Sequence, residues 1–274
     1  MLLDLLAASA ILILVVLGLA LILGLMDVIN LAHTGLMAVG VYAAVSASRA
    51  GYGFWLAALA GAIAAGVVGG VVERVVVRRL YGRPLDTILA TWGISLIIVQ
   101  GIAWIFGRGP QTLGNSLLGE VWLGYSAYRL LIVGLAALLV AGLWLLVRTT
   151  HWGLIARVVM ANEPLARGLG INTTRVRQVT FVLGASLAGF GGALIGPMQG
   201  ISPTFAMGIM VPGFLAVLLS GQSLAGLVVA CIALATTQTL FSFFFNPVYA
   251  TVAIITAAVV LLRLFPRGLV WHRA

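Results

Sequence analysis

The sequence contains no lysine, so all of its basic side chains other than histidine are arginines. A Walker A phosphate loop needs a lysine beside the β- and γ-phosphates, and a retinal-type Schiff base needs a lysine amine. The chain therefore cannot hydrolyse ATP through such a loop, and it cannot attach retinal in this way.

Cysteine and histidine are also scarce. Cys231 stands alone in an apolar run, and His33, His151 and His272 are far apart in the sequence. A single cysteine permits no intramolecular disulfide and no thiolate cluster. No HExxH motif, GxSxG motif or pair of membrane carboxylates occurs. We expect no catalytic residues, no metal site and no cofactor in this chain.

Charge is too sparse for a soluble domain, because 8% of the residues are charged and 62% are hydrophobic. Apolar runs close to the length that spans a bilayer recur along the chain. The sequence predicts an all-α polytopic integral membrane protein with eight or nine transmembrane or re-entrant helices. The predicted segments are about 3–26, 35–48, 54–77, 87–106, 128–147, 178–196, 204–220, 222–240 and 247–264.

The sequence predicts re-entrant or broken helices in two places. The second segment is too short to span without distortion, and the segments on either side of Ser220–Ser223 are separated by only a few residues. Small residues recur at four-residue spacing along 61–69 and 184–192, which favours close helix packing. The turn-rich loop 107–127 suits either an ordered cap over an entrance or a simple connector.

The net charge of +9 raises the question of a nucleic-acid partner. The arginines lie in short loops between apolar segments and form no single basic face, so we expect no nucleic acid. If loops 78–86 and 148–177 and the C-terminus are cytoplasmic, only Arg49, Arg108 and Arg129 lie outside. With nine spans, this topology places the N-terminus outside and the C-terminus in the cytoplasm.

Two polar interruptions are candidates for a transport path. The first holds Asp27, Asn30 and His33 between two apolar runs, and the second, at 193–203, contains Gln199 and Ser202 and is similar in sequence to 20–30. Polar groups at membrane depth are costly unless they face a cavity or partner groups, although such a break can also be an interfacial loop. Breaks in corresponding positions of two halves on opposite sides are typical of an inverted-repeat transporter.

The longest cytoplasmic loop, 148–177, predicts a short helix on that face. Pro164 suits its first turn, Gly170 its end, and Asn172–Thr174 the cap of the next membrane helix. Its apolar residues beside Arg167 suit either a groove in a partner protein or the lipid headgroups.

Several motifs then point to a family. The chain resembles the permease subunits of branched-chain amino acid and urea ABC importers at residues 28–33, 161–173, 180–189 and 266–269, and residues 83–93 are similar to the urea and short-chain amide branch. Two features depart from the family pattern: Thr34 stands between His33 and Gly35, and the turn at 219–226 is less rich in glycine.

This resemblance implies a single ABC-transporter permease domain over 1–274, with a cytoplasmic coupling segment at about 148–177. It also implies a multi-pass protein of the bacterial inner membrane, surrounded by lipid. The implied partners are ATP-binding subunits that hydrolyse ATP, a sister permease in a heterodimer, and a periplasmic substrate-binding protein.

The hypothesis that follows is alternating access driven by separate ATPases. We place Asn30, His33, Gln199 and Ser202 on the substrate path. The expected ATPase interface comprises Arg157, Asn162, Glu163, Arg167 and Leu169.

A path with few charges suits a neutral or zwitterionic solute. Branched-chain amino acids come first, with urea or short-chain amides as the alternative. A protein of a different class, a stand-alone channel for a small neutral solute, would share the two breaks but would need no docking helix.

Overall fold

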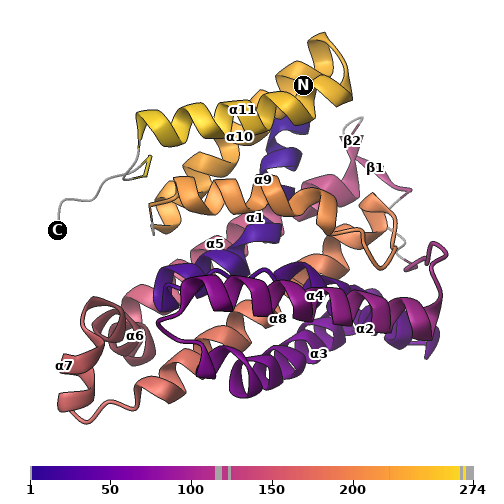
Figure 1. Ribbon diagram of the computed structural model, residues 1–274. Coiled ribbons are helices and arrows are strands. Elements are labelled where there is room, and N and C mark those ends of the chain that lie inside the picture. Colours follow the sequence, from indigo (N-terminus) through magenta and orange to yellow (C-terminus); the bar gives the residue numbers. More distant parts are fainter. Residues whose placement is uncertain (1, 115–118, 123–124, 222, 266–267, 270–274) are drawn as a thin grey trace. The chain divides into compact units, whose positions relative to one another are not determined.

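Long apolar runs form most of the helices of the computed structural model (Figure 1), which describes residues 2–114, 119–122, 125–221, 223–265 and 268–269. Two short strands, β1 (Val121–Trp122) and β2 (Tyr125–Ser126), pair antiparallel. The helices are α1 (Leu2–Met26), α2 (His33–Arg49), α3 (Phe54–Val75), the 3₁₀ turn η1 (Val77–Arg79), α4 (Pro84–Phe106), α5 (Ala127–Thr149), α6 (His151–Ala161), α7 (Glu163–Gly168), α8 (Thr173–Gln199), α9 (Met207–Leu219), α10 (Leu224–Phe244) and α11 (Pro247–Leu264).

The predicted all-α membrane architecture is confirmed. Within the described residues, 7 helices are long and apolar enough to cross a membrane: α1, α3 with η1, α4, α5, α8, α10 and α11. Every segment predicted from the sequence is helical, but α2 has 17 residues and α9 has 13. A 17-residue helix rises about 26 Å, less than the thickness of the hydrocarbon core. The second segment is therefore short, as predicted.

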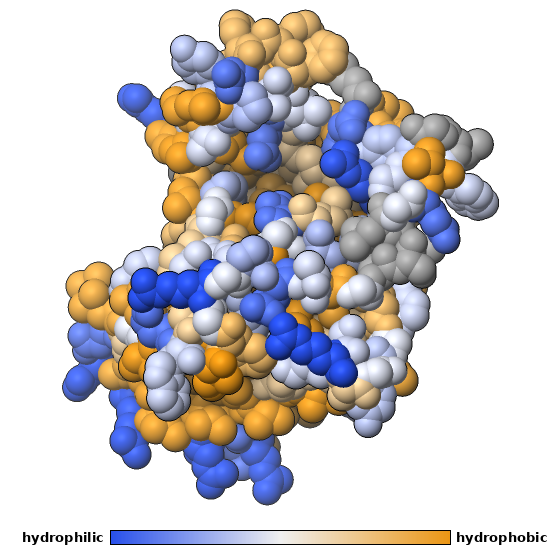
Figure 2. Space-filling view, turned by 90° about the vertical axis from the view of Figure 1, so that its right-hand side faces the viewer, coloured by the Kyte–Doolittle hydropathy of each residue, from blue (hydrophilic) through white to orange (hydrophobic). Residues whose placement is uncertain are grey.

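Large hydrophobic side chains cover much of the surface (Figure 2). On α4, for example, Leu89, Ile97 and Trp104 are exposed, whereas Thr91 and Ser95 on the same helix are buried. Soluble proteins show the opposite arrangement, with polar side chains outside and apolar side chains inside. The arrangement seen here is expected in a membrane, because contact with lipid acyl chains has no free-energy cost for apolar side chains.

The chain forms two compact units. The first comprises Met1–Val16, Ser116–Val140 and Gly208–Ala274, and the second comprises Leu17–Asn115 and Ala141–Met207. The single permease domain over 1–274 stays a prediction.

The second unit is built on close contacts between α2, α3 and α8. A Cβ atom on Gly40 would lie 2.2 Å from the Cα of Gly189, and one on Gly61 would lie 2.4 Å from the carbonyl oxygen of Gly40. A Cβ atom on Gly189 would lie 2.3 Å from the Cβ of Ala65. Because these glycines have no side chain, the three helix backbones can touch. The small-residue patterns at 61–69 and 184–192 therefore lie in helix contacts, as their spacing predicted.

Helix α4 packs against α2 in the same unit, and the two helices run parallel. The hydroxyl groups of Thr34 and Ser95 lie 2.9 Å apart near the start of α2. Farther along α2, the ring of Tyr42 lies 4.9 Å from that of Phe106, the last residue of α4. These contacts fix the start of α2 beside the first half of α4.

In the first unit, the strand pair is tied to the start of α1. Tyr125 donates a hydrogen bond from Oη to Asp4 Oδ1 over 2.9 Å, and Arg129 Nη1 lies 3.4 Å from the same oxygen. The loop 107–127 therefore contains a tethered pair of strands, which favours the ordered-cap interpretation, although residues 115–118 and 123–124 of that prediction lie outside the described residues.

The turn between α9 and α10 meets the end of the chain, also within the first unit. The N–H of Leu269 donates to the carbonyl oxygen of Leu219 over 3.0 Å. A Cβ atom on Gly268 would lie 2.5 Å from the Cα of Gly221. Residues from two of the sequence stretches compared with the family, 219–221 and 268–269, thus lie in contact.

Candidate functional site

The loop between α5 and α8 contains two helices, α6 and α7, at the end of the second unit where α8 begins (Figure 1). Helix α7 was predicted: Asn162 Oδ1 accepts from the N–H of Leu165 over 3.0 Å, and Gly170 adopts φ +80° just beyond the helix. Asn172 caps α8 as expected, since its Oδ1 accepts from the N–H of Arg175 over 3.0 Å.

Helix α6 was not predicted from the sequence. It is capped by Thr150, whose Oγ1 accepts from the N–H of Gly153 over 3.1 Å. A threonine before an apolar periodic stretch is a helix-start signal, so Thr150 was the available clue.

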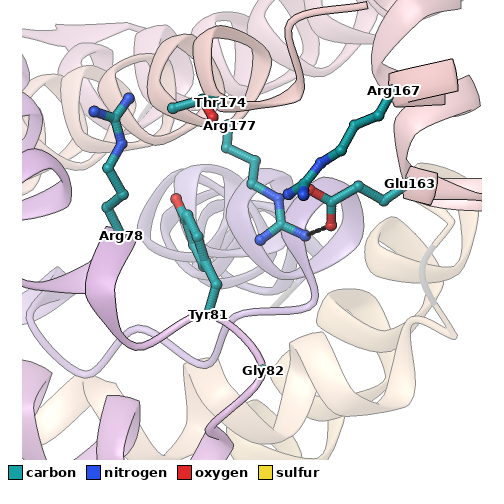
Figure 3. Close-up of a pocket in the computed structure, with 7 residues that line it drawn as sticks. All are labelled: Arg78, Tyr81, Gly82, Glu163, Arg167, Thr174 and Arg177. Carbon is teal, nitrogen blue, oxygen red and sulfur yellow. Dashed lines mark hydrogen bonds and ion pairs between the residues drawn. The ribbon is translucent and has the colours of Figure 1, made fainter. Parts of the chain in front are cut away.

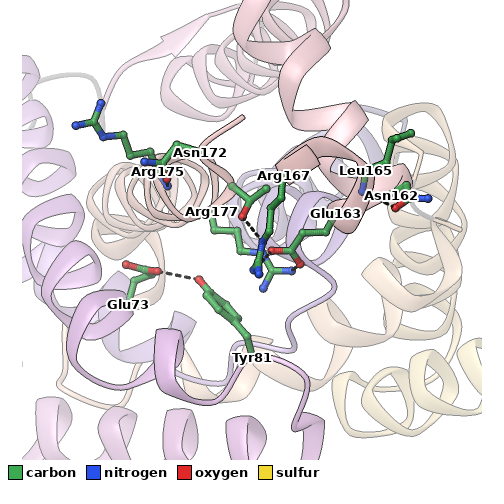
Figure 4. Close-up of polar contacts among 10 residues, drawn as sticks. Glu73, Tyr81, Asn162, Glu163, Leu165, Arg167, Asn172, Arg175 and Arg177 are labelled. Atoms are coloured by element: carbon green, nitrogen blue, oxygen red, sulfur yellow. Dashed lines mark hydrogen bonds and ion pairs between the residues drawn. The ribbon is translucent and has the colours of Figure 1, made fainter. Parts of the chain in front are cut away.

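Glu163 is the centre of the contacts that hold α7 in place (Figure 4). Its Oε1 accepts a hydrogen bond from Arg167 Nη2 over 2.7 Å, and its Oε2 accepts one from Arg177 Nη2 on α8. Arg167 also donates from Nε to Thr173 Oγ1 over 3.1 Å. The side chain of Glu163 is 22% exposed, so these ion pairs are partly shielded from water. They attach α7 firmly to the start of α8.

Burial acts to raise the pKa of the Glu163 carboxyl. Hydrogen bonds from Arg167 and Thr173 and the positive charges of Arg177 and Arg167 outweigh burial, so this pKa lies below its usual value. Glu163 is therefore ionised at neutral pH and holds both arginines.

Tyr81 connects this cluster to α3. The Arg177 guanidinium lies over its ring, 4.2 Å from the centroid, and its Oη donates to Glu73 Oε1 over 2.8 Å. Glu73 is fully buried, and Arg78 Nε lies 3.8 Å from the same oxygen. Burial raises the pKa of the Tyr81 hydroxyl, as does the hydrogen bond to Glu73, so Tyr81 remains a neutral donor. A continuous set of polar contacts thus joins α7, α8, the 80–82 turn and the end of α3.

A cavity of about 400 Å³ lies beside these contacts (Figure 3). It is lined by Arg78, Tyr81, Gly82, Glu163, Arg167, Thr174 and Arg177. Within the described ranges, no group of three or more His, Cys, Asp or Glu side chains could hold a metal ion.

The residues expected at the ATPase interface fall into two groups: residues exposed on the surface, and residues whose contacts hold α7 in place. Arg157 and Leu169 are exposed, and so is Leu165, one of the apolar residues beside Arg167 that the sequence suggested for a partner groove. Asn162 caps α7, and Glu163 faces inward toward Arg177. Arg167 belongs to both groups, since it pairs with Glu163 while its side chain stays 65% exposed.

Three residues of this continuous set of polar contacts were not singled out from the sequence: Glu73, Tyr81 and Arg177. A carboxylate within an apolar helix was an available signal for Glu73, because such groups are rare and are normally paired. Nothing in the sequence placed Tyr81 or Arg177 beside it.

The four expected path residues lie in two separate places. Asn30 and His33 are buried together at the start of α2, where the N–H of Leu31 donates to Thr91 Oγ1 over 3.1 Å. Asn30 Oδ1 accepts from the N–H of Ala32, and its Nδ2 is buried without a hydrogen-bond partner among the described residues.

Gln199 is the last residue of α8, and Ser202 lies just beyond the end of this helix. The neighbouring residue Ile201 accepts a hydrogen bond from the N–H of Gln111, beyond the end of α4, over 2.8 Å. From Thr91 to Phe106, α4 rises about 22 Å. The structure therefore brings Asn30 and His33 together but places Gln199 and Ser202 near the opposite end of the second unit.

The two breaks share one backbone feature. Helix α1 ends at Met26 and α8 ends at Gln199, and the residues that follow, Asp27 and Gly200, have φ values of +53° and +80°. These two residues correspond when 20–30 is aligned with 193–203 without gaps. The shared helix ends support the predicted repeat, and its inversion stays a prediction.

A family model described as "Branched-chain amino acid transport system / permease component" matches residues 1–264. The chain belongs to this family. It is a multi-pass membrane protein of the permease type, as the resemblance in its motifs predicted.

Curated relatives of this permease agree with the family match. It is 25% identical to the high-affinity branched-chain amino acid transport system permease protein LivH of Escherichia coli (strain K12), over 93% of this chain and 90% of that protein. The same identity and coverage relate it to BraD, a permease protein of the same description from Pseudomonas aeruginosa.

Permeases with other named cargoes match over shorter stretches. The autoinducer 2 import system permease protein LsrC of Klebsiella pneumoniae is 33% identical over 53% of this chain and 42% of its own length. No solved structure matches this permease.

Proposed function

We propose that this permease is the membrane subunit of an ABC importer that carries branched-chain amino acids across the bacterial inner membrane. LivH of Escherichia coli and BraD of Pseudomonas aeruginosa, both named for branched-chain amino acids, match over 93% of the chain, whereas the autoinducer 2 permease matches over 53%. This difference in coverage favours amino acids over autoinducer 2 as the cargo. Urea or short-chain amides are the alternative within the same family.

Separate ATP-binding subunits drive the cycle, and this chain performs no chemistry itself. The observation that carries this proposal is the pairing of Glu163 with Arg177, because it attaches α7 to the membrane helix α8. Leu165 on α7 is 57% exposed and Leu169, directly after the helix, is 67% exposed, while Arg157 is exposed on α6. This arrangement fits a helix seated in a groove of an ATPase. Movement of α7 is then transmitted to α8 through Glu163.

The substrate path uses Asn30 and His33 at one break and Gln199 and Ser202 at the other. The amides and the hydroxyl are neutral, so they suit the ammonium and carboxylate of a zwitterion without an excess of either charge. Polar groups at two separate levels of the second unit are compatible with alternating access, in which the path opens to one side of the membrane at a time.

The importer includes a sister permease and a periplasmic substrate-binding protein that delivers the amino acid. The C-terminus and the loops containing α6 and α7 lie in the cytoplasm. This topology follows from the arginine distribution.

The test compares L165E and L169E with L165Q and L169Q, which are uncharged substitutions at the same exposed positions. Uptake of labelled leucine is measured in the native host, and the proteins that copurify in mild detergent are identified by mass spectrometry. We expect the glutamate variants to lose uptake and ATPase copurification, because a carboxylate is desolvated in an apolar groove.

Unchanged uptake in L165E and L169E, with no ATPase recovered from the unmodified protein, would favour the stand-alone channel. Competition by unlabelled urea or amides, without competition by isoleucine or valine, would move the substrate to the amide branch.

A further inference from the structure

We propose that the cavity beside α7 binds the phosphate group of an anionic ligand. Three arginines line it, namely Arg78 from η1, Arg167 from α7 and Arg177 from α8. Glu163 is the one carboxylate in the described lining. The cavity therefore has an excess of positive charge (Figure 3).

The ion pairs and hydrogen bonds within the cavity leave some of its hydrogen-bond donors unused. Each guanidinium carries five N–H donors. Arg167 and Arg177 use some of theirs on Glu163 and Thr173. Arg78 Nε is buried and has no hydrogen-bond partner among the described residues, although it lies 3.8 Å from Glu73 Oε1.

The remaining lining suits a compact anion with several acceptor oxygens. Thr174 contributes a hydroxyl group, and Gly82 leaves open space because nothing lies within 4 Å of the position its Cβ would occupy. The planar fork of arginine matches phosphate oxygens in pairs. A metal cation would be repelled by the arginines, and a neutral solute would leave uncompensated the positive charge that Glu163 and Glu73 do not balance.

The place of the cavity indicates two sources for the phosphate group. It lies where the apolar helices α3 and α8 meet loops, at the depth expected for lipid headgroups. Basic pockets at the cytoplasmic ends of membrane helices bind anionic headgroups. An anionic phospholipid and free inorganic phosphate offer the same chemistry, and experiment can distinguish them.

Two substitutions reduce the positive charge of the cavity, and each has a matched control. R78Q removes one guanidinium. T174E places a carboxylate in the lining, in the first turn of α8, where an acidic residue is compatible with the helix dipole. T174Q has the same size as T174E without the charge. R175Q makes the same charge change as R78Q at an exposed arginine whose side chain points away from Arg177 and Glu163 (Figure 4).

Binding is measured on the full chain without any transport assay, so the result is independent of the importer proposal. In the lipid arm, the protein is reconstituted in phosphatidylcholine nanodiscs with or without phosphatidylglycerol, and native mass spectrometry counts the phosphatidylglycerol retained. In the phosphate arm, equilibrium dialysis measures binding of labelled inorganic phosphate in detergent.

We expect R78Q and T174E each to weaken binding about tenfold in the arm that shows saturable binding to the unmodified protein. A tenfold loss corresponds to about one charge-assisted contact. T174Q and R175Q should bind as the unmodified protein does. Because T174E keeps every internal ion pair, it remains informative if R78Q fails to fold.

Two results overturn the proposal. One is the absence of saturable binding in both arms. The other is an equal loss of binding in R175Q and R78Q, or in T174Q and T174E, because the attraction would then come from the general basic surface.

Discussion

Glu163 on α7 accepts a hydrogen bond from Arg177 on α8, and the same arginine lies over the ring of Tyr81. Arg177 is thus shared between the short helix and the turn that follows η1. A displacement of α7 must move Arg177 or break its pair with Glu163. This single shared side chain is the physical basis for the coupling proposed above.

Removing the Glu163 charge should uncouple α7 from α8. We expect E163Q to assemble and to keep its partners but to lose most leucine uptake, because a neutral amide holds two arginines more weakly than a carboxylate does. A double-mutant cycle with R177Q, measured by unfolding in detergent, should give a coupling free energy of about 1–2 kcal/mol. A coupling free energy near zero would mean that the pair contributes nothing to holding α7.

The same pair should make stability depend on pH. Because the pKa of Glu163 is lowered in the folded protein, its contribution is fully present above the unfolded pKa of about 4.3 and is lost as the pH falls through the folded pKa. The difference in unfolding midpoint between the unmodified protein and E163Q should therefore be constant near neutral pH and shrink below about pH 4.3. A difference that grew on acidification would contradict this sign.

Tyr81 should be important for stability through its hydroxyl group. Y81F keeps the ring beneath Arg177 but leaves the buried Glu73 Oε1 without its 2.8 Å donor. We expect a loss of about 1–3 kcal/mol in the free energy of unfolding, the cost of an unsatisfied buried acceptor. T251V is a suitable control, since it removes an exposed hydroxyl that bonds only its own helix. Equal stability of Y81F and T251V would exclude this role for the hydroxyl.

The contact of three helices at Gly189 should tolerate no added methyl group. In G189A the new Cβ would stand 2.3 Å from that of Ala65, so the helices must separate. We expect a loss of about 1–3 kcal/mol, or failure to assemble. G101A on α4 is the matched control, because nothing lies within 4 Å of its new Cβ, and it should be neutral or stabilising. Thermal unfolding followed by circular dichroism in detergent compares the two variants.

Much of the secondary structure could be predicted because membrane helices are encoded locally. A run of apolar residues must satisfy its own backbone hydrogen bonds in lipid, so length and hydropathy alone locate the helix. The caps of α7 and α8 were equally local, since Asn162 and Asn172 each bond to the N–H three residues later. Helix α6 was missed because Thr150 follows α5 with almost no polar linker to mark a new start.

The sequence by itself determined the class of protein: lipid-facing apolar helices, arginine-marked loops and a small-residue pattern that demands close packing. Only the tertiary structure decided which polar groups meet. Glu73, Tyr81, Glu163 and Arg177 come from four separate segments, and no local periodicity relates them. Their meeting depends on the crossing of α3 and α8, whose close approach is permitted by glycines such as Gly61 and Gly189. Local hydropathy acts over a few residues, whereas such a cluster requires the whole packing of the unit.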